Sequence, residues 1–419
     1  MKEPGSGSDA AARVCYLWRT MTERLYLEDP YLARFAARVR EVRVLDGRPA
    51  VVLDRSAFYP EGGGQPGDRG VLTPAEAGLA PMQVLDTQER DGEVLHLVAE
   101  GALPATASAV EARVDWARRF DHMQQHHGQH LLSAAFERVH GAPTRSFHLG
   151  ERSCTIDLDC PIGKLDAPAL RRAEAAANES VWRDLPVVAR DFEGEERARL
   201  TLRKEALKGN RVVLVEGVDA SPCGGTHPRR TGEVGAIAVL RAQRWGDGMA
   251  RIEFVCGGRV VARLAEATEA IAKAAEALKA APADLATAAG RLAAEAHARR
   301  KAAEALEAEL ALHRARELAA AKPEGPVVAT FPGGAGFARA VATALAGHGR
   351  VALVAGVEEG RAHLVFSRPK GEGPALNALL KDALLLLGGK GGGSPEHAQG
   401  SGDPARLTEA LAAAAERLR

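Results

Sequence analysis

Two pairs of side chains in this sequence have the residue types and the spacing of a metal site. His126 and His130 lie four residues apart in a segment with helical periodicity, so both imidazoles project from one face of a helix. Cys223 and His227 are also four residues apart, and the glycines between them allow a tight turn that folds the two side chains towards one point. One thiolate and three imidazoles suit zinc better than a hard cation such as magnesium. We therefore predict that these four residues share one Zn²⁺ ion.

The number of ligands limits how such a site can work. Four protein ligands fill a tetrahedron, which is the pattern of a structural zinc site, whereas a catalytic zinc keeps one position open. Three alternatives remain. One ligand is loose, with Cys223 or His227 as the candidates because they lie on a turn; or the coordination expands; or the metal orients the substrate while another element positions the water that zinc would otherwise activate.

A second candidate site is the segment 58–68, which reads FYPEGGGQPGD. Its consecutive glycines, Gly62, Gly63 and Gly64, let backbone N–H groups approach a ligand closely, and Gln65 offers both a hydrogen-bond donor and an acceptor. We expect these four residues to bind a substrate and Gln65 also to take part in catalysis. On composition alone, the segment could equally be a flexible turn between strands.

The segments around these motifs predict an α+β protein. Residues 1–20 are rich in Gly, Ser and Ala and read as a disordered tail. Residues 21–116 alternate short β-like runs with glycine or proline turns, which is typical of a small β-barrel or sandwich. Residues 117–140 carry apolar residues at helical spacing and Gly141 ends this helix. Together with the mixed helices and strands that follow, residues 117–258 form the predicted α/β core that carries the metal ligands.

Two further segments, 259–322 and 323–419, differ in composition from the core and from each other. Residues 259–322 are almost entirely Ala, Glu, Leu, Arg and Lys, and Pro282 divides them into two helices. Heptad spacing in the second helix predicts a helical hairpin or a coiled-coil spacer. In residues 323–419 β-runs again alternate with helices, which indicates a separate C-terminal α/β domain that contains a glycine-rich segment at 388–393.

Composition and charge narrow the class of protein. Of the 419 residues 46% are hydrophobic and 26% are charged, as in ordinary globular proteins, and no apolar run is long enough to predict a membrane span. Five scattered cysteines are too few for a disulfide framework, so a reducing cytoplasm is the simpler location. Lys plus Arg equals Asp plus Glu, at 55 each, which counts mildly against a nucleic-acid partner unless cations cluster locally. One such cluster, which could equally be a solvated face, comprises Arg197, Arg199, Arg203, Lys204, Lys208 and Arg211.

Taken in order, the motifs resemble those of the editing domain of alanyl-tRNA synthetase and of its free-standing relatives, the alanyl-tRNA editing proteins. The matching segments are 58–68, then 123–132 (MQQHHGQHLL), then 223–227 (CGGTH), and the likeness covers about residues 21–257. The segment 388–400 is similar to the glycine-rich stretch of the synthetase's C-terminal domain, which in the family helps to bind tRNA and mediates oligomerisation. The resemblance therefore implies a long-form editing protein. Its editing core would be residues 117–258, and residues 323–419 would bind tRNA and could form a homodimer.

The resemblance also implies an activity. The family hydrolyses the ester of mischarged Ser-tRNA-Ala, and Gly-tRNA-Ala is a second candidate substrate, while correct Ala-tRNA-Ala is spared. A second sieve of this kind makes chemical sense because a single pocket rejects poorly an amino acid that is smaller or that only adds a hydroxyl. Two alternatives stay open: a non-enzymatic tRNA-binding module with a structural metal, and a metal hydrolase that acts on another acyl substrate.

The sequence departs from the family at two positions. Ser56 stands where the family often has a threonine whose hydroxyl is implicated in choosing the substrate, so we expect a catalytic role for Ser56 with a shifted preference. His127 follows the first metal ligand, where Thr or Ser is usual, and its ring could crowd the mouth of the pocket. Its side chain points about 100° away from His126 on the helix, so we do not count it as a ligand. His122, one turn before His126, is the candidate partner outside the ligand set.

Overall fold

The computed structural model describes residues 21–101, 103–204 and 210–419, so the predicted tail at 1–20 lies outside the described residues, as does Lys208. The chain divides into two compact units, Met1–Ala270 and Ile271–Arg419. Both units combine helices with strands, and the predicted α+β class is confirmed. Within the described part of the chain, no helix is both long enough and apolar enough to cross a membrane.

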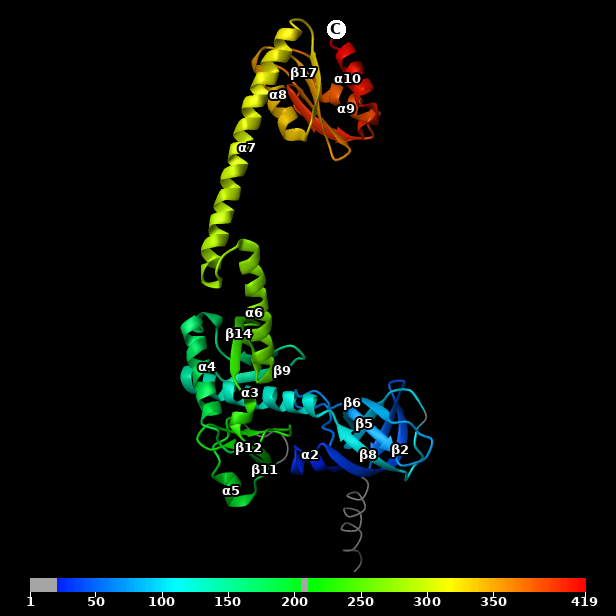
Figure 1. Ribbon diagram of the computed structural model, residues 1–419, viewed down its shortest axis with the longest axis vertical. Coiled ribbons are helices and arrows are strands. Elements are labelled where there is room, and N and C mark those ends of the chain that lie inside the picture. Colours follow the sequence, from blue (N-terminus) through cyan, green and yellow to red (C-terminus); the bar gives the residue numbers. More distant parts are fainter. Residues whose placement is uncertain (1–20, 102, 205–209) are drawn as a thin grey trace, which may run out of the picture. The chain divides into compact units, whose positions relative to one another are not determined.

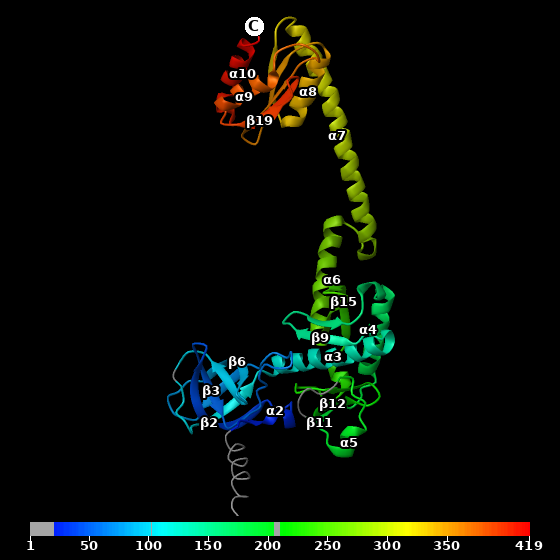
Figure 2. The same ribbon diagram turned by 180° about the vertical axis from the view of Figure 1, so that it is seen from behind.

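Unit 1 begins with a closed barrel of six antiparallel strands in the order β2-β3-β7-β6-β5-β8 (Figure 2). Its first strand is long enough to pair with β8 through its first half and with β3 through its second half. Buried and exposed residues alternate along β8, because successive side chains of a strand point to opposite faces. The strands are β2 (Arg34–Leu45), β3 (Arg48–Leu53), β5 (Gly70–Pro74), β6 (Met82–Arg90), β7 (Glu93–Val98) and β8 (Ala109–Val114). Three short elements flank them: β1 (Glu23–Arg24), α2 (Leu25–Glu28) and β4 (Arg55–Ser56).

A buried polar pair lies inside the barrel. Oγ of Ser56 is 2.7 Å from Nε2 of His96, and Nδ1 of His96 is 2.8 Å from the carbonyl oxygen of Val51. Because a carbonyl can only accept, Nδ1 carries the proton and Nε2 accepts from the Ser56 hydroxyl. Both side chains are fully buried, and burial lowers the pKa of His96 from 6.5 to about 4.

His96 should make the protein sensitive to acid. Its pKa is lower in the folded state than in the unfolded state, so the unfolded chain takes up more protons between pH 6.5 and pH 4, and stability falls as the pH drops through that range. From pH 7 to pH 5 we expect this residue to remove about 2 kcal/mol of the free energy of unfolding. His96→Gln keeps a donor for Val51 and an acceptor for Ser56, and it should lose that part of the pH dependence in urea unfolding. His148→Gln, at an exposed position on β9 (Thr144–Leu149), is the control. Equal pH dependence in His96→Gln and the wild type would contradict the prediction.

Helix α3 (Trp116–His140) connects the barrel to the rest of unit 1 (Figure 1). It begins after Asp115, whose side chain accepts a hydrogen bond from the backbone N of Arg118, and ends at Gly141, whose φ of 59° is left-handed. The helix predicted from the periodicity, with Gly141 as its end, is therefore confirmed. Most of its middle is buried, because different faces pack on different elements.

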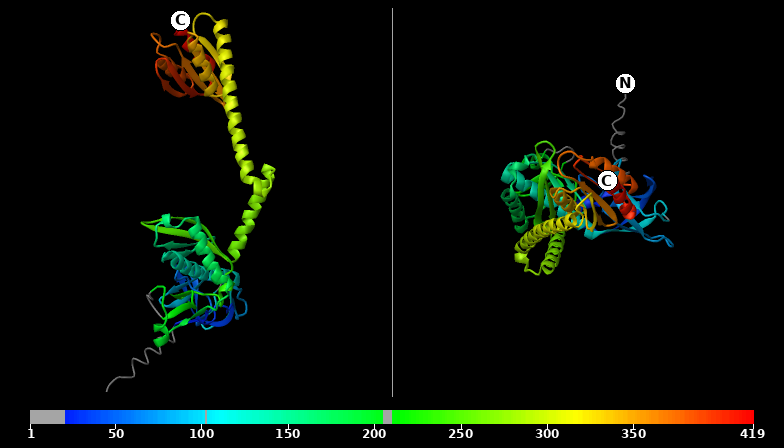
Figure 3. Two further views of the ribbon diagram at one scale, coloured as in Figure 1. Left: turned by 90° about the vertical axis from the view of Figure 1, so that its left-hand side faces the viewer. Right: turned by 90° about the horizontal axis from the view of Figure 1, so that it is seen from above.

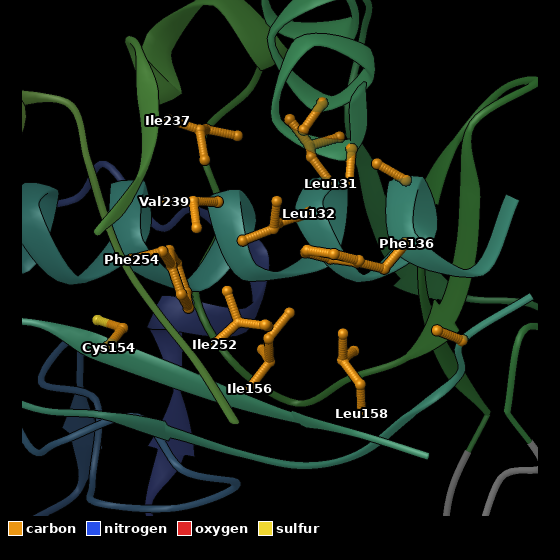
Figure 4. Packing of buried hydrophobic residues seen from close by; sticks show 14 of the residues in the cluster. Leu131, Leu132, Phe136, Cys154, Ile156, Leu158, Ile237, Val239, Ile252 and Phe254 are labelled. Carbon is orange, nitrogen blue, oxygen red and sulfur yellow. The ribbon is translucent and has the colours of Figure 1, made fainter. Parts of the chain in front are cut away.

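One face of α3 packs on a four-stranded sheet. Leu131, Leu132 and Phe136 meet Ile252 and Phe254 from this sheet in a single core (Figure 4). The sheet has the order β14-β15-β10-β9, and α4 packs against the same core. Its elements are β9 (Thr144–Leu149), β10 (Cys154–Leu158), α4 (Ala167–Trp182), β14 (Ile237–Trp245) and β15 (Met249–Cys256).

A second, smaller sheet carries the other half of the metal-ligand motif. Its strands are antiparallel in the order β11-β12-β13, and β13 ends one residue before Cys223. The elements of this region are β11 (Val188–Asp191), α5 (Gly194–Ala198), β12 (Arg211–Val215) and β13 (Asp219–Pro222). Two short 3-10 turns, η1 (Ile162–Lys164) and η2 (Thr231–Val234), contact β14 and the helices α3 and α4 instead.

The alanine-rich segment forms two helices, α6 (Gly258–Leu278) and α7 (Leu285–Ala321), with a 3-10 turn at Pro282–Asp284 between them. The predicted division at Pro282 is confirmed. No residue of α6 is buried, and in α7 only Ala288, Ala311 and Ala315 are. Pairing of these helices in a coiled coil stays a prediction.

Unit 2 contains a five-stranded mixed sheet in the order β16-β17-β18-β20-β19. Different helices cover its two faces (Figure 3): the end of α7 and α8 pack on one, and α9 and α10 pack on the other. Neighbouring residues of β17 show the alternation, since Val354 belongs to the first core and Leu353 to the second. The elements are β16 (Val327–Pro332), α8 (Ala335–Gly347), β17 (Ala352–Glu358), β18 (Arg361–Ser367), α9 (Leu376–Leu386), β19 (Lys390–Gly393), β20 (His397–Gly402), η4 (Pro404–Arg406) and α10 (Leu407–Glu416).

Candidate metal centre and its cavity

The structure brings the four predicted ligands together. His126 and His130 come from the middle of α3, and Cys223 and His227 come from the turn after β13. One ligand atom from each residue lies within 4.8 Å of those of the other three. Sγ of Cys223 is 3.4 Å from Nε2 of His126 and 3.3 Å from Nε2 of His227. The three histidines are buried, whereas Cys223 is partly exposed.

Each of the three imidazoles is held at its other nitrogen. Nδ1 of His126 lies 2.8 Å from Oε1 of Gln65, and Nδ1 of His130 lies 2.9 Å from Oδ2 of Asp219. These contacts leave Nε2 of each ring as the atom that faces the other candidate ligands. In metal sites a ligating histidine characteristically donates its second N–H to an oxygen of this kind, which fixes the ring and the tautomer.

The third imidazole is held by an unexpected residue. Nδ1 of His227 lies 3.2 Å from Nδ1 of His127. His127 is not among the four candidate ligands, but its ring contacts one of them, which the sequence did not predict. It does point away from His126 along the helix, but His227 comes from a separate turn and lies against both rings, with centroids 4.6 Å from His126 and 5.3 Å from His127.

Gln65 links three parts of the site. Besides contacting His126, its Oε1 accepts a hydrogen bond from the backbone N of Thr226 at 3.1 Å, and its Nε2 donates to Oγ1 of Thr226 at 2.8 Å. Gln65 is fully buried, and backbone hydrogen bonds of 2.9 and 3.1 Å with Gly62 close the turn that contains it. The predicted glycine-rich segment therefore lies directly against the candidate ligands.

Two further residues that the sequence analysis singled out, Ser56 and His122, make no hydrogen bond with the candidate ligands. Ser56 lies in the barrel core, where its Oγ is bound to His96 and accepts from the backbone N of Phe58 at 3.1 Å, and it does not line the cavity described below. A direct role in catalysis is therefore not supported by its position. His122 is buried, but its Nδ1 has no hydrogen-bond partner among the described residues and it does not hold a ligand. Burial and then the charge of Arg118 lower the pKa of His122 to about 4.

Asp219 is the functional residue that the sequence reasoning missed most plainly. It is an acidic residue four positions before Cys223, at the start of β13, and it is buried. Burial raises its pKa, but the hydrogen bond and charge of His130 and the charge of Arg203 outweigh this and hold the pKa below its usual range. An acidic residue in a strand that leads into a Cys-His turn is the signal that could have found it.

The charges around Cys223 favour its ligating form. Burial raises the pKa of this thiol, but the neighbouring His126 and His227 outweigh that effect and hold the pKa well below its ordinary value. For His130, burial lowers the pKa, yet the hydrogen bonds and charges of Asp219 and Cys223 raise it to about 9. A site that stabilises a thiolate in this way is suited to a cation, since the thiolate is the form that binds metals.

A cavity of about 420 Å³ opens beside these residues. Three of the four candidate ligands line it, namely His126, His130 and Cys223, so a bound molecule would reach the ligands from this side. Gly62 and Gly63 of the predicted substrate-binding segment also line it, whereas Gly64 faces the ring of Phe147 and Gln65 lies behind. The remaining lining residues are Arg24, Tyr26, Tyr59, Pro60, Glu61, Glu89, Gln129, Phe147, Arg203, Lys204, Ser221, Pro222, Gly224 and Gly225.

The two glycines of the Cys-His turn should differ sharply when they are replaced. A Cβ on Gly225 would lie 2.3 Å from Cε1 of His126 and 2.8 Å from Oε1 of Gln65, whereas a Cβ on Gly224 would meet nothing within 4 Å. Gly225→Ala should therefore displace the His126 ring and lower metal affinity roughly 10- to 100-fold. Gly224→Ala is the matched control and should retain metal. Competition with a chromogenic chelator measures both affinities, and equal affinities in the two variants would contradict the prediction.

Comparisons with known proteins agree with this organisation. Residues 30–118 match the family model described as tRNA synthetases class II (A), residues 211–253 match the threonyl and alanyl tRNA synthetase second additional domain, and residues 334–419 match the DHHA1 domain. Among solved structures, the C-Ala domain of Aquifex aeolicus alanyl-tRNA synthetase matches 22% of this chain and 87% of its own at 23% identity, with a TM-score of 0.21. That score is too low to support an argument about the fold.

Curated relatives match over longer stretches. The alanyl-tRNA editing protein AlaX-L of Pyrococcus horikoshii is 39% identical over 59% of this chain and 61% of its own length. Alanine–tRNA ligases of Halorubrum lacusprofundi and Pyrobaculum neutrophilum are 35% and 34% identical over 95% and 98% of this chain. The chain spans less than half of those two ligases, at 44% and 46% of their lengths. By these matches, the chain is similar to an alanyl-tRNA editing protein over more than half of its length and to alanine–tRNA ligases over nearly all of it.

Proposed function

We propose that this chain is a trans-editing deacylase that hydrolyses the ester of Ser-tRNA-Ala, accepts Gly-tRNA-Ala as a second substrate and spares Ala-tRNA-Ala. One observation carries the proposal. Three of the four candidate ligands border a cavity that the glycine-rich segment also lines, and each imidazole of the set is held at its second nitrogen. The name of the AlaX-L relative and the match to the second additional domain support a tRNA substrate.

The donor set fits zinc. His126, His130, Cys223 and His227 would hold Zn²⁺, which supplies a Lewis acid for an ester carbonyl oxygen. The fit rests on the orienting contacts from the side-chain oxygens of Gln65 and Asp219 as much as on the ligands, because oxygen partners of this kind usually accompany ligating histidines.

The partial exposure of Cys223 bears on the question of a fourth, loose ligand. It is the one member of the set that is not buried, and it lines the cavity together with His126 and His130, whereas His227 does not. We propose that a substrate oxygen approaches on the Cys223 side of the cavity, where Cys223 would help to hold the metal and is the candidate for the loose ligand. Gln65, which holds His126, then acts by positioning that ring rather than by touching the substrate.

The remaining parts of the chain receive roles consistent with this activity. Residues 21–116 would present the glycine-rich segment and residues 117–258 would form the editing core. Residues 323–419 would bind tRNA and form a homodimer. The heptad residues Leu292, Leu306 and Leu310 of α7 are 55%, 66% and 52% exposed in the single chain, which leaves them available for coiled-coil pairing in the spacer 259–322. We place the activity in the cytoplasm.

A deacylation assay with Ser-, Gly- and Ala-tRNA-Ala, with metal content measured on the same preparation, tests the proposal. We expect release of serine and glycine with one zinc per chain, and a preference for Ser over Ala of roughly 100-fold. Turnover on none of the three, with unfolding on chelation, would indicate a tRNA-binding module with a structural metal. Equal turnover of small aminoacyl esters and aminoacyl-tRNA would indicate a hydrolase of another acyl substrate.

A further inference from the structure

One wall of the cavity carries two adjacent cations, Arg203 and Lys204. Nε of Arg203 donates to Oδ1 of Asp219 at 2.7 Å, and the Arg203 side chain is only 10% exposed. Its Nη1 atom is buried and has no hydrogen-bond partner among the residues that the structure describes. A guanidinium has five N–H donors, so the contact with Asp219 leaves most of them unused. Burying such donors is unfavourable unless a ligand accepts from them.

Lys204 adds a second positive charge beside this guanidinium. It is half-buried and lines the same cavity, and it forms no ion pair within the described parts of the chain. Burial and then the charge of Arg203 lower the pKa of its ammonium group. Two neighbouring cations in a partly buried wall repel each other, and an anion between them removes that repulsion.

The other charged side chains that line the cavity are Arg24, Glu61 and Glu89. Arg24 forms an ion pair with Glu89 at 3.0 Å, so its charge is already balanced by a residue of the same cavity. Glu61 is exposed on the glycine-rich segment. Arg203 shares its counterion Asp219 with His130 and keeps one buried donor without a described partner, and Lys204 has no ion pair among the described residues, so these two residues form the positive side of the cavity.

We infer that Arg203 and Lys204 bind the phosphate of the terminal nucleotide of the tRNA, while its aminoacyl ester lies at the candidate metal centre. This inference rests on the proposed function and names the part of the substrate that this wall recognises. A guanidinium presents a planar set of donors that matches the oxygens of a phosphate, and an ammonium adds a charged donor from the side.

Asp219 sets the spacing between the group that would bind the phosphate and the candidate metal centre at which the ester would lie. One of its oxygens accepts from Arg203 and the other lies 2.9 Å from Nδ1 of His130. A single buried carboxylate therefore holds both a phosphate-binding guanidinium and a candidate metal ligand. A terminal nucleotide whose phosphate is bound at Arg203 would present its ester at a set distance from His130.

The test compares two small substrates that differ only by this phosphate: 3′-O-seryl-adenosine and its 5′-phosphate. In the wild type we expect the phosphorylated ester to have the higher kcat/KM by roughly 10- to 100-fold, the effect of one or two charge-assisted hydrogen bonds. In Lys204→Met this ratio should fall towards one, and in Arg203→Lys it should be intermediate because the charge stays and the planar donor set is lost. Lys164→Met, at an exposed position on η1, is the control and should keep the wild-type ratio.

Two readouts separate this inference from the proposed function. If the wild type hydrolyses neither ester nor Ser-tRNA-Ala, the proposed function fails. The site is then judged by calorimetric titration with inorganic phosphate, which should bind the wild type and bind Lys204→Met at least tenfold more weakly. A ratio that is the same in the wild type and Lys204→Met, with metal content equal in both, overturns the inference, and so does phosphate binding that is unchanged in Lys204→Met.

Discussion

Replacing Cys223 by alanine is expected to remove the bound metal and to lower kcat/KM for Ser-tRNA-Ala by roughly 1,000-fold, which corresponds to about 4 kcal/mol of lost transition-state stabilisation. The thiolate is the only sulfur ligand of the set and the only ligand that is not fully buried. Without it, three imidazoles remain, and their geometry depends on contacts made at the other ring nitrogen. Elemental analysis after dialysis and a deacylation assay on the same preparation measure the two effects.

The control for this variant is Cys160→Ala, since Cys160 is a buried cysteine that is not one of the candidate ligands. It should keep its metal and its activity. Cys223→Ser, which retains a weaker oxygen ligand, should fall between Cys223→Ala and the wild type. A fully active Cys223→Ala protein would overturn the account of the metal centre.

Replacing Arg119 by methionine is expected to lower the free energy of unfolding by about 3–5 kcal/mol. Arg119 and Asp68 form an ion pair in which both side chains are only 1% exposed. Nε of Arg119 donates to Oδ2 of Asp68 at 2.9 Å, and Nη1 donates to the carbonyl oxygen of Pro30 at 2.8 Å. The substitution would leave the Asp68 carboxylate buried without a counterion, which is where most of the penalty arises.

The same pair positions the glycine-rich segment. Oδ2 of Asp68 also accepts a hydrogen bond from the backbone N of Tyr59 at 2.6 Å, and the backbone N of Asp68 donates to the carbonyl oxygen of Tyr59 at 2.9 Å. These contacts close the segment 59–68 at its base. Loss of Arg119 should therefore also reduce activity in protein that is still folded.

Urea unfolding measures the stability effect against a matched control. Arg145→Met removes an ion pair with Asp159 that is exposed on both sides, at 66% and 42%, and should change the free energy of unfolding by less than about 1 kcal/mol. The double variant Asp68→Asn with Arg119→Met should be more stable than Arg119→Met alone, because no uncompensated charge remains. Equal stability of Arg119→Met and Arg145→Met would show that the buried pair does not hold this segment.

Local rules in the sequence determined the candidate ligands and the elements that carry them. The repeat of an α-helix places His126 and His130 on one face whatever the helix packs against. The end of α3 could also be predicted from a local rule, because Gly141 adopts the left-handed φ of 59° at low energetic cost. A four-residue turn likewise brings Cys223 and His227 together without help from the rest of the chain.

Contacts between elements were decided by the tertiary structure. The atoms that hold the three imidazoles come from Gln65, Asp219 and His127, which are 61, 89 and 100 residues away from the histidines they contact. Such pairs depend on how the barrel, α3 and the small sheet pack, and no periodicity within one element records that packing. The sequence therefore determined which side chains can act as ligands. Only the packed structure decided that Ser56 turns into the barrel and that His127 and Asp219 face the site, because burial and hydrogen bonding between distant elements set those orientations.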